Sequence, residues 1–324
     1  MFARLFFAAP FAFAVTASAA TVVETVLVGN AGNAADATGI GSVSELYRIG
    51  TYEVTNAQYS EFLNAVDPAG ANSLNLYNPS MGSDPVGGIT LNPAAPAGAR
   101  FELKSDKGNK PVNYVSFIDT MRFANWLQNG QGASNTEDGA YTVISGGLAG
   151  RNPGATVFIP SQNEWYKAAY FDPANPAADD NGTPDYWLFP TQSDSVPTRA
   201  TADAAGDVTN PGSNVANYFA EVENVTTVGG TSSVSFFGTF DQAGNVREWN
   251  EAVIFGTNRQ IRGGGFLSQT NRLQSTGPDS EMPEFEAADL GFRIAMVPEP
   301  SAAVAAILAG GLSLAGRRRQ RALV

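Results

Sequence analysis

The chain has 324 residues, of which 43% are hydrophobic and 15% charged, so it can bury a sizeable core. It contains no cysteine and no histidine, which excludes disulfides, thiolate nucleophiles, Ser-His-Asp catalysis and metal sites built on imidazole or thiolate. Its formal charge of −12 argues against nucleic acid as a partner, because the phosphates would be repelled.

The first twenty residues have the pattern of a secretory signal. Arg4 precedes an apolar run at 5–15, and a small-residue Ala-Ser-Ala motif follows at 17–19. A basic, an apolar and a small-residue region in this order predict that residues 1–20 are a cleaved signal peptide. The alternative is an N-terminal membrane anchor, for which the apolar run is short.

The body between the two ends predicts three helices and a few short strands. Residues 21–41 are small and rich in Gly and Ala, and we interpret them as a leader to the domain. Each helix begins with a capping box, in which Ser or Thr precedes Gln, Asp or Glu by three residues. The boxes are Thr55 with Gln58, Ser116 with Asp119, and Ser161 with Glu164. The predicted strands are 46–49, 141–144, 156–159, 234–237 and 260–263.

The segment from Asp241 to Glu248 offers two carboxylates with the turn-forming Gly244 between them. Such a loop can present side-chain and carbonyl oxygens together, as hard cations need. With imidazole and thiolate excluded, oxygen ligation of calcium is the metal chemistry that this sequence favours.

The C-terminus has three parts in a fixed order. A Val-Pro-Glu-Pro motif at 297–300 precedes an apolar stretch at 301–316, and an arginine cluster follows at 317–321. The apolar stretch is short for a membrane span, and the arginines would stay on the cytoplasmic side. The tail, 297–324, resembles the PEP-CTERM sorting signal of Gram-negative bacteria. That resemblance implies processing by an exosortase, transient anchoring in the inner membrane, and a final place at the cell surface or in a biofilm matrix. The alternative is a plain tail anchor.

Removing both ends makes the body more acidic. Without Arg4, the four tail arginines and Glu299, 14 basic and 30 acidic residues remain, a net charge of −16. This charge keeps the body soluble and favours divalent cations or basic partners.

Seven short motifs occur in one order between residues 45 and 296. They are YEVTNAQY at 52–59, KPVNYVS at 110–116, IPSQNEW at 159–165, ANY at 216–218, GNVREW at 244–249, RGGG at 262–265 and GFR at 291–293. This series resembles the formylglycine-generating enzyme, or sulfatase-modifying factor, family. The resemblance implies one irregular, loop-rich α+β domain over 42–296, related to the C-type lectin fold.

The resemblance implies a redox enzyme, but this chain lacks the residues for that chemistry. The family's enzyme holds copper with two cysteines, and their positions here are Ser268 and Leu273, neither of which can act as a thiolate. A family serine is replaced by Gly265 and a family tryptophan by Arg247. A second branch uses histidine-ligated iron, which zero histidine excludes. We therefore expect neither copper, iron nor formylglycine synthesis.

The resemblance also implies two calcium sites. The first would use the side chains of Asp241 and Glu248 with the carbonyls of Gly244 and Val246. The second would use the side chain of Asn217 and the carbonyl of Tyr218. The acidic turn that would complete this second site is only partly matched in this sequence. The alternative for Glu248 is a helix cap or an ion pair with an arginine.

These observations favour an exported, calcium-stabilised, non-catalytic binding protein. Its ligand would be an exopolysaccharide or a peptide, bound in a groove near Arg247, Arg262 and Ser268. One rival is an extracellular enzyme with rebuilt carboxylate- or metal-based chemistry, because the segment 281–289 carries four carboxylates. A third interpretation is a structural surface protein with no ligand beyond calcium.

Overall fold

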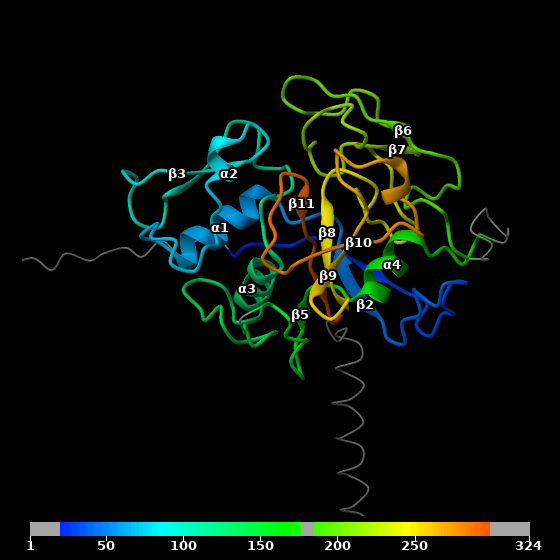
Figure 1. Cartoon of the computed structure of the whole chain (residues 1–324), viewed down its shortest axis with the longest axis horizontal. Helices are drawn as coiled ribbons and strands as arrows, with labels where there is room; N and C mark the ends of the chain where they lie inside the picture. Colours follow the sequence, from blue (N-terminus) through cyan, green and yellow to red (C-terminus); the bar gives the residue numbers. More distant parts are fainter. Residues whose placement is uncertain (1–19, 145, 176–184, 299–324) are drawn as a thin grey trace, which may run out of the picture.

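The computed structural model describes residues 20–144, 146–175 and 185–298. The predicted signal peptide and almost all of the predicted tail lie outside these residues. Short helices and strands are joined by long loops, as Figure 1 shows. Within these ranges, no helix has both the length and the apolar character needed to cross a membrane.

All three predicted capping boxes are present. In each, the N-cap hydroxyl accepts a hydrogen bond from the third helical N–H, and the third side chain accepts one from the N-cap N–H. The helices are α1 (Asn56–Val66), α2 (Ser80–Ser83), α3 (Phe117–Gln128), α4 (Gln162–Tyr170) and the 3-10 helix η1 (Thr270–Arg272).

Two four-stranded sheets form the frame. The first has the order β1-β2-β12-β5, with β1 (Thr25–Val28), β2 (Tyr47–Gly50), β12 (Ala295–Met296) and β5 (Val157–Phe158). The second has the order β10-β9-β8-β11, with β10 (Asp279–Glu281), β9 (Asn258–Arg262), β8 (Arg247–Ile254) and β11 (Leu290–Gly291). Two small pairs complete the strands: β3 (Ile89–Leu91) with β4 (Phe101–Leu103), and β6 (Thr198–Arg199) with β7 (Val215–Ala216).

Besides short strands that the sequence did not predict, the structure differs from the predicted elements as follows. The segment expected to lead into the domain contributes β1, which pairs antiparallel with β2. No strand forms at 141–144, because the Asn125 amide pairs with both the backbone N–H and the carbonyl of Tyr141 and so takes the place of a neighbouring strand. The segment 234–237 makes only a bridge, between Val234 and Phe240.

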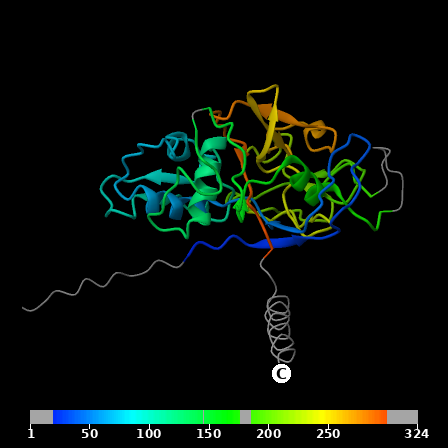
Figure 2. The ribbon, with the colours of Figure 1, turned by 90° about the horizontal axis from the view of Figure 1, so that it is seen from below.

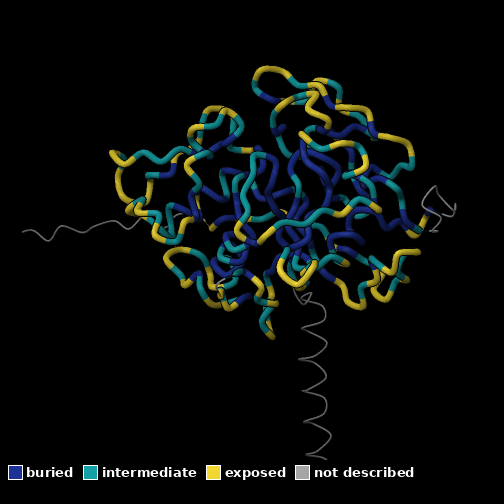
Figure 3. Tube along the Cα trace, in the orientation of Figure 1, coloured by how far each residue is buried: buried dark blue, intermediate teal, exposed yellow. Residues whose placement is uncertain are grey.

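The core lies between the helices and the two sheets, where the buried trace is concentrated in Figure 3. Aromatic rings dominate it: Phe123 contacts Phe62 and Phe292 edge-on, with centroids 5.4 Å apart in both pairs. Trp126 and Trp249 are also buried there.

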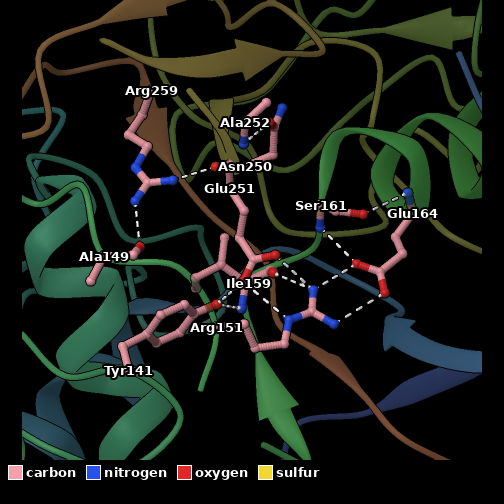
Figure 4. Close-up of polar contacts among 10 residues, drawn as sticks. All are labelled: Tyr141, Ala149, Arg151, Ile159, Ser161, Glu164, Asn250, Glu251, Ala252 and Arg259. Atoms are coloured by element: carbon pink, nitrogen blue, oxygen red, sulfur yellow. Dashed lines mark hydrogen bonds and ion pairs between the residues drawn. The ribbon is translucent and has the colours of Figure 1, made fainter. Parts of the chain in front are cut away.

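A polar network ties α4 to the second sheet (Figure 4). The guanidinium of Arg151 lies 2.9 Å from Glu164, at the start of α4, and 2.8 Å from Glu251 on β8. Tyr141 also donates to Glu251, and Arg259 donates to the carbonyls of Ala149 and Glu251. This network holds β8, whose first residues line the cleft described next.

Candidate functional site

A cleft of about 330 Å³ opens beside the start of β8. Arg247 and Ser268, both predicted as groove residues, line it together. The other lining residues are polar or charged except for Leu267: they are Gln269, Asn271, Arg272, Asp279 and Asp289. The cleft therefore places hydrogen-bond donors and acceptors close to one another.

The charges in the cleft are balanced. Arg247 donates from Nε and Nη2 to the two oxygens of Asp289, at 3.0 and 2.9 Å, a bidentate geometry that fixes the guanidinium plane. Asp279 lies 3.6 Å from Arg247 and 3.7 Å from Arg272. Because two arginines face two aspartates, the cleft suits a neutral ligand that is rich in hydrogen-bonding groups.

Ser268 and Leu273, which the family resemblance aligns with its two cysteines, meet around Gly264. A Cβ on Gly264 would lie 2.7 Å from the Leu273 side chain and 3.2 Å from Cβ of Ser268, and the φ of +66° also favours glycine. The Ser268 hydroxyl accepts a hydrogen bond from the N–H of Gly265. Leu273 is fully buried among apolar side chains. An alcohol and an alkyl group therefore occupy the place where copper-binding thiolates would be needed.

The third predicted groove residue, Arg262, does not line this cleft. It is buried, donates to the carbonyl of Ser275 and stacks over the ring of Tyr166. Arg293 forms a buried ion pair with Glu248, which confirms the alternative expected for Glu248, and its Nε and Nη2 each lie 2.6 Å from a carboxylate oxygen.

Two of the predicted calcium ligands belong to a buried charge cluster. Asp241, Glu248 and Glu53 surround the single guanidinium of Arg293. Both oxygens of Glu53 lack a hydrogen-bond partner. Burial raises the pKa of Asp241 to about 6 and the pKa of Glu53 well above its usual range, and repulsion by Glu248 adds to both shifts. Three carboxyls against one cation make this cluster electrostatically suited to a further positive charge.

The fit to calcium differs between the predicted ligands. The Glu248 carboxylate already accepts from Arg293 and from the indole of Trp165, so a divalent ion there would meet the guanidinium charge. Asn217 fits better: its Nδ2 donates to the carbonyl of Asn224, and its buried Oδ1 has no partner. Within the described ranges, no three acidic side chains are arranged around one metal position.

A second pocket, of about 500 Å³, lies at the start of α3. Asp119 and Glu286 line it and share a hydrogen bond, and Asn78 also donates to Glu286. Burial raises the pKa of Asp119 to about 6, while burial and the neighbouring Asp119 raise the pKa of Glu286 to about 7. The sequence did not single out this pair, because Asp119 was explained by its capping box and Glu286 by an acidic segment.

Comparison with known proteins decides the family. The model of the sulfatase-modifying factor enzyme 1-like domain matches residues 23–297. The chain belongs to this family. None of the curated proteins matches.

Three solved structures are similar to this family member, and the first of them supports the shared fold. Treponema denticola variable protein 1 is 16% identical, with a TM-score of 0.50, over 85% of this chain and 95% of that chain. The protein named CarF is 21% identical, with a TM-score of 0.49, over 86% of this chain and 99% of that chain. PvdO from Pseudomonas aeruginosa is 16% identical, with a TM-score of 0.43, over 85% and 92%. The family match begins at residue 23 and includes β1. Most of the segment 21–41 is therefore part of the domain.

Proposed function

We propose that this chain is an exported, non-catalytic binding protein of the sulfatase-modifying factor family that holds a glycan or peptide in the Arg247 cleft. One observation carries the proposal: a polar, charge-balanced cleft contains Ser268, at one of the two positions where the family resemblance implies a copper-binding cysteine. Paired arginine and aspartate side chains with neighbouring amides are suited to the hydroxyls of an exopolysaccharide or to a peptide backbone.

The two ends of the sequence support export. The N-terminal pattern would direct the chain through the inner membrane of a Gram-negative bacterium. The C-terminal pattern would anchor it briefly until an exosortase processes the tail. The body would then lie at the cell surface or in the extracellular matrix, in contact with the polymer that we propose as its ligand.

The Arg247→Glu variant tests the cleft. We expect binding to extracellular matrix material to fall at least tenfold. The new carboxylate would face Asp289 and Asp279, and the hydrogen-bond donors of Arg247 would be lost from the cleft. The measurement is sedimentation of the protein with isolated matrix. Arg100→Glu, which lies outside the cleft, is the matched control for the change in charge. Equal binding by both variants and the native chain would refute the proposal.

We further propose that calcium stabilises the fold through the Asn217 side chain and the Tyr218 carbonyl, the second of the two predicted sites. The buried, orphaned Asn217 oxygen supports this choice. A bound calcium ion would join loop segments electrostatically and would take no part in a reaction.

Chelation tests the calcium proposal. A ligand bound only by the folded state adds about 2.7 kcal/mol at a concentration one hundred times its Kd. We expect chelator to lower the Tm of the native chain and to leave the Tm of Asn217→Ala unchanged. The measurement is thermal unfolding together with metal analysis. A native Tm that ignores chelator, with no calcium in the sample, would contradict this proposal.

The rival enzymatic function has one observation in its favour. The Asp119–Glu286 pair shares a hydrogen bond in a pocket large enough for a sugar ring, and two carboxyls that share a proton can act as acid and base. Turnover of native exopolysaccharide that is lost in Glu286→Gln would establish this rival.

A further inference from the structure

One face of the first sheet carries a row of partly exposed side chains, of which Met296 and Val157 also pack against the edge of the core. The strand register places Leu27 opposite Arg48, Arg48 opposite Met296, and Met296 opposite Val157, so one row crosses all four strands. Side chains alternate along a strand, and the adjacent positions such as Ile49 are buried. We call the row formed by Leu27, Arg48, Met296 and Val157 the outer row.

The outer row is apolar around a single cation. Leu27 is 47% exposed, and Arg48, Met296 and Val157 are half-buried. The Arg48 guanidinium donates to the hydroxyl and the carbonyl of Thr25, and no described carboxylate lies within ion-pair distance of it. In a chain with a net charge of −12, an arginine without an acidic partner among exposed apolar groups is suited to an external anion.

The chain leaves the described structure from this same sheet. Met296 ends β12, Val297 is 48% exposed, and Pro298 is the last described residue. The apolar stretch that we expect to anchor in the membrane begins at Ser301, and three residues span at most about 10 Å. While the tail is anchored, the outer row therefore stays close to the bilayer surface. Figure 2 shows β1, in blue, at the edge from which the red end of the chain leaves.

We propose that the outer row docks on the phospholipid bilayer while the tail is anchored. The proposal rests on the membrane anchoring given under the proposed function. Apolar side chains of this kind insert at the boundary between headgroups and acyl chains, and an arginine pairs with lipid phosphate. Because the connection to the tail is short, the outer row is held at a high local concentration near the bilayer. A single surface of low affinity needs this concentration in order to bind.

Docking by this face also orients the molecule. The yellow and orange strands β8, β9 and β10 lie at the opposite edge from β1 in Figure 2. The cleft that begins at β8 would then open away from the bilayer, toward the matrix. The same geometry would keep ligand binding and anchoring from competing for one surface.

The absence of cysteine permits a direct test on the full chain. Single cysteines carry an environment-sensitive fluorophore at Leu27→Cys in the outer row, at Phe255→Cys in the turn between β8 and β9, and at Val304→Cys in the tail. Phe255 is the matched control, because it is 88% exposed and lies in the turn of the opposite sheet. Each protein is reconstituted in vesicles of phosphatidylethanolamine and phosphatidylglycerol that contain a nitroxide-labelled lipid as quencher.

We expect lipid quenching at position 27 to be several-fold stronger than at position 255, and Arg48→Gln to reduce it. Strong quenching at 304 with none at 27 would overturn the docking face and leave the anchored tail intact. Fluorophore self-quenching at 27 that depends on protein density would identify a second copy as the occupant and also overturn it. No quenching at 304 would overturn the anchoring itself, and the docking with it.

Discussion

Asp119 and Glu286 show how burial changes the behaviour of ordinary carboxyl groups. In the folded protein they hold their protons up to a pH of about 6 and about 7, whereas in an unfolded chain the pKa values of Asp and Glu are roughly 4. The folded state therefore binds more protons between these limits. Folding is favoured at low pH, and stability falls as the pH rises from about 4 to about 7.

The Glu286→Gln variant should remove most of this dependence. The amide keeps a hydrogen bond to the neighbouring carboxyl but carries no charge, so we expect a gain on the order of 1 kcal/mol at pH 8, after allowance for solvent screening. At pH 4.5 the variant and the native chain should be similar. Urea unfolding at both pH values checks this. A native stability that rises between pH 5 and pH 7.5 would contradict the assignment.

Single residues also show where sequence reasoning stops. Glu248 was expected to bind calcium, with an ion pair to an arginine as the alternative, and the structure shows that pair with Arg293, 45 positions away. Arg262 was expected near the groove and instead packs on Tyr166, because the turn at Gly263 and Gly264 directs the chain toward the cleft only after it. Motif spacing cannot give the direction of a side chain.

At the scale of elements, local signals were predicted well and distant pairing was not. The capping boxes at Thr55, Ser116 and Ser161 were recognised because donor and acceptor lie three residues apart. Strand β8 was missed, because its partners are β9 and the distant β11, and half of it carries polar residues. The loop at Tyr141 was mistaken for a strand because an asparagine side chain replaces its pairing partner.

The Arg151 network should matter more than a surface ion pair. Removing Arg151 leaves Glu164 and Glu251 without their shared cation in partly buried positions, so we expect Arg151→Ala to cost about 3 kcal/mol. The exposed pair of Arg199 with Glu221 serves as the control, and Arg199→Ala should cost less than about 1 kcal/mol. Urea unfolding of both variants measures the difference. Equal losses would show that the network adds nothing beyond a surface contact.

At the scale of the whole molecule, the fold class followed from the order of seven motifs, but the start of the domain did not, because the family match begins at residue 23. The cleft could be placed near Arg247 and Ser268 from the same motifs. The residues that give it its charge balance, Asp279 and Asp289, could not, because they come from a later strand and loop that only the fold brings beside β8. The charge on a binding surface is a property of the assembled chain.

The central claim is that a redox family scaffold here binds its ligand without transforming it. The most direct measurement incubates the purified chain with native exopolysaccharide and records both the bound fraction and the size distribution of the polymer. The account predicts saturable binding that depends on Arg247 and a polymer of unchanged length. A shortened polymer, with shortening lost in Glu286→Gln, would contradict it and identify the chain as an enzyme.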